Sequence, residues 1–394
     1  MYYVLFCTLY CLRIPTFVSS TELLVKVEAD LLKFNYKYMK TKFLLYNFIL
    51  LLVSAFSVLL TGCEDTPDLQ QVSLIEVTNV TANSAECKVT VNLNNSSKIT
   101  ERGVIYDNKE WKQQEVITDT STGDGTFTIK LENLLPGTIY GARGYAKNSE
   151  GVVYSTIYSF KTPLKEGTMT DREGNEYKTI CIGKQEWMAE NLRTATYNNG
   201  TAIQNVTAAS AWQGNTLGAY CVYSNTAANK EIYGSLYNWY AVNKRASSGS
   251  EETLLAPEGW RVPSMDDWNT LMNHLISQQY GYGGVEENLI GKAMASTTLW
   301  NESATEGAVG YEMNTNNTAL FNILPSGYRT NRGTYSRLGE KAYFWTTSMI
   351  GTNAAYVMLS YDNAGLVIDD TELNASGGYV RAGGFAVRCM RDVE

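Results

Sequence analysis

Apolar and polar residues alternate between Ser84 and Leu93, in the stretch SAECKVTVNL. Successive side chains of a β-strand point to opposite faces of a sheet, so this stretch predicts a strand with one buried and one solvated face. Further alternating runs follow, separated by clusters of Asn, Gly and Asp: RGVIY, GTFTIKLENL, TIYGARGYAK and VVYSTIYSFKT. Short strands with such turns predict a small antiparallel β-sandwich over residues 71–163.

A turn and a tyrosine narrow this prediction. Leu134, Pro136, Gly137 and Tyr140 stand in the stretch LLPGTIYGARGYAKNSEG. The stretch resembles the fibronectin type III family, in which a Leu-x-Pro-Gly turn precedes a tyrosine that fixes the corner of the sandwich. The resemblance implies that Tyr140 is buried with its hydroxyl bonded to the backbone. Such domains act as spacers, so we expect no chemistry here.

The segment before the sandwich carries an export signal. Lys40 and Lys42 precede an apolar run, Phe43 to Leu60, which ends in LLTGCED. A basic start, an apolar middle and small residues before a cleavage site are typical of a secretory signal. Leu60, Thr61, Gly62 and Cys63 resemble the lipobox of bacterial lipoproteins, which implies cleavage before Cys63 and a lipid on its sulfur. The alternative is a plain transmembrane anchor formed by the apolar run.

This signal divides the N-terminal region into three segments. Residues 39–62 are the expected lipoprotein signal peptide, and residues 1–38 are an upstream extension that we expect not to be translated. Residues 63–70 are an acidic tether with Glu64, Asp65 and Asp68. Acidic residues there resemble the surface-export tags of Bacteroidetes-type lipoproteins, which implies an outer-membrane location on the cell surface. Attachment on the periplasmic side is the alternative.

Composition excludes several classes of function. The net charge is −8 and no run of Lys and Arg is present, so we expect no nucleic-acid partner. The chain has one histidine, His274, which excludes zinc sites built from several imidazoles. His274 lies in a helical pattern without a Glu-x-x-His spacing, and we interpret it as a packing or surface residue. We expect no cofactor and no metal.

The C-terminal region, residues 164–394, mixes hairpin signals with helical patterns. DREGN at 171–175 and DNAG at 362–365 predict turns between strands. The stretch YGSLYNWYA, 233–241, predicts one helix, and the residues after Pro263 predict another. The apolar positions that would share a helix face are Tyr233, Leu236, Tyr237, Tyr240 and Ala241 in the first helix, and Trp268, Leu271, Met272, Leu275 and Ile276 in the second.

Two adjacent acids in GWRVPSMDDW could be an acid–base pair or a helix start. Pro263 excludes a preceding helix, Ser264 is a good N-cap, and Asp267 completes the Ser-x-x-acid spacing of a capping box. Paired catalytic carboxylates must face each other across a gap, whereas adjacent helix residues diverge by about 100°. We therefore interpret Asp266 and Asp267 as structural and predict no catalytic residue.

Six stretches of this region carry a family resemblance. They are DREGNEYKTICIGKQEWMAENLRTATYNNGTAI, GAYCVYSN, YGSLYNWYAVN, LAPEGWRVPSMDDWNTL, LPSGYRTNRGTY and GGFAVRCMRD. Together they resemble the Fibrobacter succinogenes major paralogous domain, found on lipoproteins and secreted proteins. GWRVPSMDDW and GGFAVRC are also similar to formylglycine-generating sulfatase-modifying proteins. The second resemblance implies a C-type-lectin-like α+β domain with two helices and long loops.

The cysteines leave their pairing open. Family members often read Leu-Cys-Pro-x-Gly-Trp, but Ala256 stands at the cysteine position here. Cys87 lies on the apolar face of the sandwich, so a bridge would join two of Cys181, Cys221 and Cys389. Free buried thiols are the alternative.

We expect a non-catalytic lipoprotein that binds a glycan or a protein through its lectin-like domain. Aromatic rings beside amides and charges suit sugar recognition. The expected ligand-binding residues lie in two predicted loops: Tyr328, Arg329, Asn331, Arg332, Tyr335 and Arg337 in the first, and Tyr361, Asp362 and Asn363 in the second.

Three other interpretations compete with this one. The chain could be a structural or tip subunit of a surface fibre. It could be an enzyme of the formylglycine-generating kind, which needs paired cysteines where Cys389 stands alone. Calcium could bind near DNAG or Asp369–Asp370, although no acidic cage is visible there.

Overall fold

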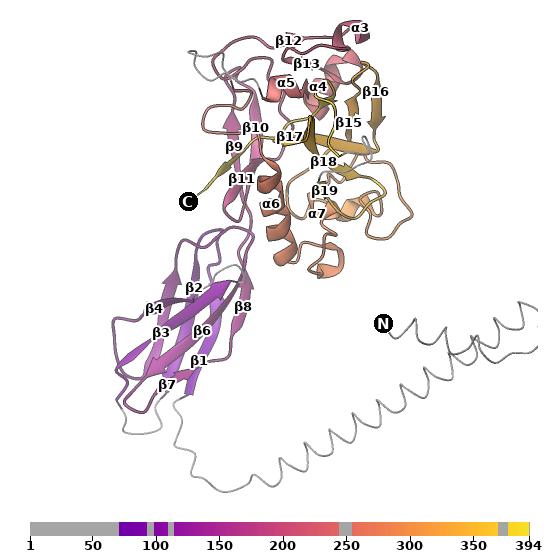
Figure 1. The fold of residues 1–394 in the computed structure, drawn as a ribbon. Coiled ribbons are helices and arrows are strands. Elements are labelled where there is room, and N and C mark those ends of the chain that lie inside the picture. Colours follow the sequence, from indigo (N-terminus) through magenta and orange to yellow (C-terminus); the bar gives the residue numbers. More distant parts are fainter. Residues whose placement is uncertain (1–70, 93–97, 109–113, 244–253, 369–376, 394) are drawn as a thin grey trace, which may run out of the picture. The chain divides into compact units, whose positions relative to one another are not determined.

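The computed structural model describes residues 71–92, 98–108, 114–243, 254–368 and 377–393 (Figure 1). All of them fall within one compact unit, Leu69–Glu394. The predicted signal peptide, Cys63 and the acidic tether lie outside the described residues. Among the described helices, none has the length and apolarity needed to cross a membrane.

Residues 71–161 form an antiparallel β-sandwich, here called the sandwich. One sheet has the order β1 (Gln71–Thr78), β2 (Ala85–Asn92), β5 (Gly125–Leu131). The other contains β4 (Glu115–Thr118), β3 (Glu101–Asn108) and β6 (Ile139–Lys147), and β6 also pairs with β7 (Val152–Tyr154) and β8 (Tyr158–Lys161). The predicted sandwich is confirmed.

The alternation in β2 sets the core of the sandwich. Ala85, Cys87, Val89 and Val91 are buried, while the residues between them are half-buried. Tyr140 is fully buried, and its hydroxyl accepts a hydrogen bond from the Leu135 backbone N–H at 2.7 Å. The predicted corner tyrosine is therefore confirmed.

Residues 165–393, here called the head, contain two sheets. The smaller has the order β21 (Met390–Asp392), β11 (Gln185–Met188), β10 (Glu176–Ile182), β9 (Lys165–Thr170). The C-terminal strand thus pairs with a strand from the start of the domain. The predicted DREGN turn joins β9 to β10 as expected.

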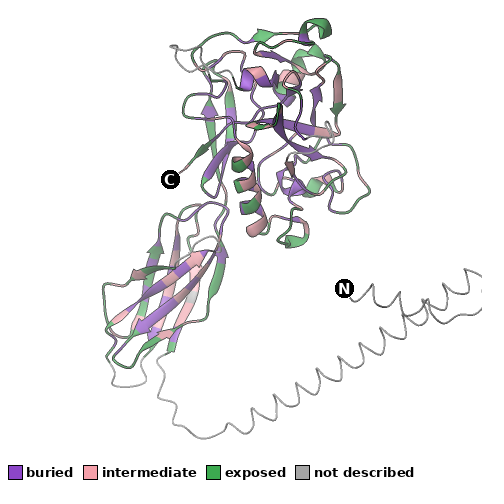
Figure 2. Ribbon diagram, viewed as in Figure 1, coloured by how far each residue is buried: buried purple, intermediate pink, exposed green. Residues whose placement is uncertain are grey.

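The larger head sheet has the order β12-β13-β14-β20-β15-β17-β18-β19, and β16 pairs with β15. Its strands are β12 (Gln204–Asn205), β13 (Ala219–Cys221), β14 (Leu236–Asn238), β15 (Ser326–Arg329), β16 (Tyr335–Leu338), β17 (Lys341–Ile350), β18 (Asn353–Ser360), β19 (Val367–Ile368) and β20 (Gly384–Phe385). The predicted DNAG turn lies between the antiparallel strands β18 and β19. Figure 2 shows β17 and β18 buried along much of their length.

The helices of the head are short apart from one. They are α3 (Ala209–Trp212), α4 (Ala227–Tyr233), α5 (Trp239–Val242), α6 (Met265–Ser277) and α7 (Gly291–Met294), with single 3₁₀ turns η1 (Tyr223–Asn225), η2 (Tyr282–Gly284) and η3 (Met313–Thr315). The β-rich α+β class predicted from the sequence is confirmed.

The single helix predicted over 233–241 is wrong. Helix α4 ends at Tyr233 because Gly234 adopts φ +75°, and a Cβ there would lie 2.7 Å from the Asn191 Cβ. The chain then forms β14. Asn238 starts α5, since its side-chain oxygen accepts a hydrogen bond from the Ala241 N–H at 3.1 Å.

Helix α6 matches its prediction and packs against both head sheets. Trp268 lies 4.6 Å from the ring centre of Trp187 in β11 and 5.6 Å from that of Phe344 in β17. Leu271 and Leu275 are buried in the same cluster. His274 is also buried, and its ring lies against Gly183, which confirms a packing role.

Asp267, the second of the two adjacent acids of GWRVPSMDDW, has a structural role. Ser264 and Asp267 form the predicted capping box. The Asp267 carboxylate also pairs with Arg261, whose guanidinium contacts both carboxylate oxygens of Asp392 at 2.9 Å. The motif therefore ties the start of α6 to the C-terminal strand β21.

The capping box gives a stability prediction. We expect Ser264→Ala to lower the free energy of unfolding by about 1 kcal/mol, because the Asp267 N–H loses its partner at the start of α6. Asp266→Asn is the matched control, since Asp266 lies outside the box and contributes only a few tenths of a kcal/mol through the helix dipole. Urea denaturation measures both variants. Equal losses would contradict the assignment.

Candidate functional site

The first predicted loop is largely a β-hairpin. Tyr328 and Arg329 lie in β15, whereas Tyr335 and Arg337 lie in β16. Only Asn331 and Arg332 belong to the connecting turn, which Thr330 and Thr334 close through a 2.8 Å backbone hydrogen bond. The loop assignment is therefore wrong for four of the six residues, because the stretches on either side of the 330–334 turn form paired strands.

Tyr328 is a core residue. It is 8% exposed, and its ring centre lies 4.9 Å from that of Tyr343 and 5.7 Å from that of Phe385. The Phe385 ring also stacks on Trp345 at 4.1 Å. Tyr328 thus belongs to the aromatic core of the head, and its predicted role as a ligand-contacting residue has no support from its position.

Arg329 is fully buried and holds neighbouring segments together. Its guanidinium donates hydrogen bonds to the carbonyls of Val206, Thr207 and Gly333. It also lies over the rings of Trp212, at 4.5 Å, and Tyr335, at 4.9 Å. Since these contacts occupy the side chain, Arg329 is a structural residue rather than a surface cation.

The remaining predicted residues are more accessible. Arg332, Asp362 and Asn363 are exposed, and Arg337 pairs with Glu340 at 2.8 Å. The Glu340 carbonyl accepts a hydrogen bond from the Tyr361 N–H at 2.9 Å, so the two predicted segments meet at Glu340. Asp362 accepts from the Ser360 hydroxyl, and Asn363 from the Gly365 N–H, which makes this segment a tight turn.

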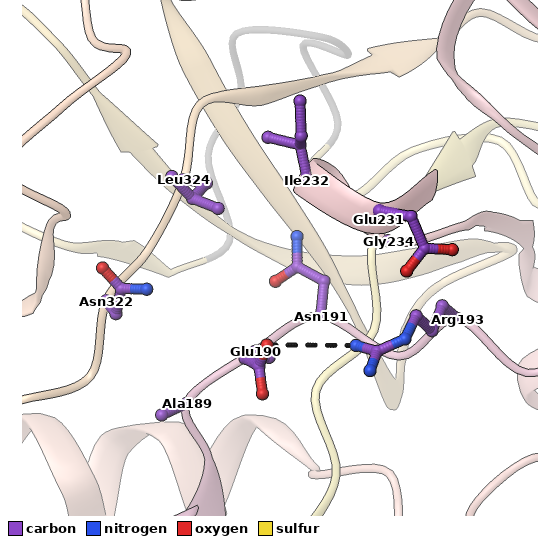
Figure 3. A pocket seen from close by; sticks show the side chains of 9 residues that line it. All are labelled: Ala189, Glu190, Asn191, Arg193, Glu231, Ile232, Gly234, Asn322 and Leu324. Carbon is purple, nitrogen blue, oxygen red and sulfur yellow. Dashed lines mark ion pairs between the residues drawn. The ribbon is translucent and has the colours of Figure 1, made fainter. Parts of the chain in front are cut away.

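A hollow lies in a different part of the head and was missed from the sequence. Its volume is about 40 Å³, and three chain segments line it (Figure 3). The lining residues are Ala189, Glu190, Asn191, Arg193, Glu231, Ile232, Gly234, Asn322 and Leu324. Figure 3 shows Asn322 and Leu324 on one side, Glu231 and Ile232 on another, and Asn191 between them.

Arg388 supports this hollow from inside the fold. It is 1% exposed, and its guanidinium donates to the Asn191 side-chain oxygen at 2.9 Å, the Asn322 carbonyl at 2.9 Å and the Phe321 carbonyl. No carboxylate in the described part of the chain forms an ion pair with it. Burial lowers the pKa of Arg388 to about 9, while the negative charge of Glu190 opposes that shift.

The four described cysteines are free and buried. Burial raises the pKa of Cys87 to about 12 and that of Cys181 to about 11. Burial also raises the pKa of Cys221 and Cys389. All four side chains therefore stay protonated near neutral pH. Of the two alternatives that the sequence leaves open for Cys181, Cys221 and Cys389, the structure shows free buried thiols and not a bridge.

The described residues contain no cluster of three or more His, Cys, Asp or Glu side chains suited to a metal ion. Asp369 and Asp370, considered for calcium, lie outside the described residues.

Comparisons with solved structures and with a family profile both found matches. Solved structures similar to this chain include the sensor domain of the anti-sigma factor RsgI4 of Pseudobacteroides cellulosolvens, with 17% identity over 24% of this chain and 76% of that one and a TM-score of 0.21. They also include the sixth fibronectin type III domain of human fibronectin type III domain containing protein 3, with 23% identity over 28% of this chain and 99% of that one and a TM-score of 0.23.

No curated protein matches the chain. A family profile does match, that of the Fibrobacter succinogenes major domain, over residues 180–391. The matched region includes the capping box, the hollow and Arg388, and it covers more than half of the 394 residues. The chain therefore belongs to the Fibrobacter succinogenes major domain family.

Proposed function

We propose that the chain is a non-catalytic, lipid-anchored lipoprotein that binds a glycan or a protein through its head, outside the cytoplasm. The observation that supports export and lipid attachment is the apolar run that ends in Leu60-Thr61-Gly62-Cys63. Outer-membrane attachment at the cell surface is supported by the resemblance of Glu64, Asp65 and Asp68 to surface-export tags. The sandwich is the spacer in this proposal.

The head supplies the binding surface in this proposal. Its core is rigid, because large aromatic side chains fill both faces of the larger sheet. Its accessible polar residues lie on strand β16 and on the turns at 330–334 and 361–365, where a fixed scaffold can present them to a partner. Of the predicted ligand-binding residues, those that are not buried are Asn331, Arg332, Tyr335, Arg337, Tyr361, Asp362 and Asn363.

The state of the thiols supports a non-catalytic head. A formylglycine-generating reaction requires a reactive thiolate with an activating partner. Cys221 and Cys389 are fully buried, and burial raises the pKa of both. This observation disfavours the enzymatic alternative.

The test is a binding screen with the detergent-extracted full chain against a glycan array and against cell-surface proteins. Binding that Arg332→Ala and Asp362→Ala weaken would support the predicted loops as the contact surface. Glu258→Gln is the control, because Glu258 is exposed and lies outside both segments. If the folded wild-type chain binds nothing in either screen, a binding function is contradicted and a structural role remains.

A further inference from the structure

We propose that the hollow bounded by Asn191, Asn322 and α4 binds the hydroxyl-bearing edge of a neutral sugar. This inference rests on the proposed function and assigns a site and a ligand class to it. The site differs from the predicted loops, because neither 328–337 nor 361–363 contributes a lining residue. Its walls come from residues 189–193, α4 with Gly234, and residues 322–324.

Two lining side chains have unused hydrogen-bonding capacity. Within the described part of the chain, the Asn322 side-chain amide and the Glu231 carboxylate make no hydrogen bond, although both border the hollow. The amide offers two donors and an acceptor, and the carboxylate offers acceptors. A hydroxyl group both donates and accepts, so a ligand with adjacent hydroxyls can satisfy both residues.

The floor of the hollow, formed by Glu190 and Asn191, is already fixed by internal contacts. Asn191 accepts from Arg388 and donates to the Tyr233 carbonyl at 2.9 Å. Glu190 accepts from the Lys178 N–H at 2.6 Å and lies 3.9 Å from Arg193. Binding therefore requires little ordering of the floor, which lowers the entropic cost for a small ligand.

The charge distribution favours a neutral ligand. Glu190 and Glu231 carry negative charge at the hollow, and their carboxylates disfavour an anion. Arg193 at the wall and Arg388 beneath Asn191 carry positive charge and disfavour a cation. The two carboxylates and two guanidinium groups balance, so the hollow has no net charge that would favour a charged ligand over a neutral polar one.

The volume of the hollow and its apolar side chains determine which part of a sugar could enter it. A hollow of about 40 Å³ accommodates about three water-sized groups, which suits neighbouring hydroxyls rather than a whole sugar ring. Ile232 is 46% exposed, and Leu324 lines another side of the hollow (Figure 3). These side chains offer apolar surface to the C–H groups of the part of the ring that stays outside.

The experiment uses the detergent-extracted full chain and saturation-transfer NMR. The neutral probes are glucose, galactose, mannose and N-acetylglucosamine at millimolar concentration. The charged probes are Nα-acetyl-lysine amide and inorganic phosphate. Two pocket variants are compared with wild type: Asn322→Gly, which removes the amide while allowing the left-handed φ of +54°, and Glu231→Gln, which keeps an acceptor but removes the charge.

We expect at least one neutral sugar to bind, with an affinity that does not change between low and high salt. Asn322→Gly should weaken that affinity about tenfold, since a hydrogen bond in the site is lost. Glu231→Gln should weaken it less, because the amide oxygen still accepts. Glu258→Gln, an exposed change away from the hollow, should leave it unchanged.

Three results would overturn the inference. If the sugar signal persists unchanged in both pocket variants, the hollow is not the site, although the proposed binding function survives. If Nα-acetyl-lysine amide binds and Glu231→Gln abolishes that binding, the hollow accepts cations. If no neutral sugar binds wild type, the ligand class is wrong, and binding of a surface protein would then still support the proposed function.

Discussion

Replacing Arg388 with Ala is expected to lower the free energy of unfolding of the head by about 3–5 kcal/mol. The substitution removes a buried side chain and leaves its hydrogen-bond acceptors, the carbonyls of Phe321 and Asn322 and the side chain of Asn191, without a donor. The guanidinium also lies 4.8 Å from the ring of Phe321 and 5.5 Å from that of Phe344, so the variant creates a cavity as well.

Two variants separate the causes of that loss. Arg388→Met keeps most of the packing volume but donates no hydrogen bond. Its free energy of unfolding should therefore lie between that of wild type and that of Arg388→Ala. Arg332→Ala removes an exposed arginine of the same domain and should change stability by no more than about 0.5 kcal/mol. Urea midpoints with unchanged slopes measure all three. A loss below about 1 kcal/mol for Arg388→Ala would contradict the structural role of Arg388.

Replacing Cys63 with Ala is expected to abolish lipid attachment completely. The predicted lipid bonds to the Cys63 sulfur, and Ala has no nucleophile to receive it. Because the predicted cleavage falls immediately before Cys63, the variant should also keep its leader and run as a larger precursor. Labelled palmitate incorporation and gel mobility in the native host measure both effects.

Cys87→Ala is the matched control for this experiment. Cys87 is a buried thiol of the sandwich, so its loss should leave lipid labelling at the wild-type level. Labelling that persists in Cys63→Ala and disappears in another cysteine variant would place the lipid elsewhere and refute the lipobox.

Local sequence patterns predicted the elements whose signals lie within a few residues. The alternation in β2, the DREGN and DNAG turns and the capping box of α6 each depend on neighbours in the sequence. The same reasoning failed over 233–241, where apolar residues at helical spacing are buried as a strand and a short helix. Every residue of 233–241 except Tyr240 is buried, so the exposed polar positions that distinguish a helical from a strand period are missing.

The site residues were harder to predict, because their partners are distant in the sequence. Arg329 contacts Val206 and Thr207, and Arg388 contacts Asn191 and Phe321. An arginine beside a turn usually lies in solvent, and no local signal marks one whose charge is buried among backbone carbonyls. The hollow likewise combines three segments, so only the tertiary fold brings Asn322 to Glu231.

Mass spectrometry of the mature protein, purified from membranes of its native host, tests the central claim most directly. The account predicts that the first residue is Cys63, carrying the mass of attached acyl chains, and that no peptide from residues 1–62 remains. An intact peptide that crosses Gly62–Cys63, or a Cys63 that carries no lipid, would contradict it.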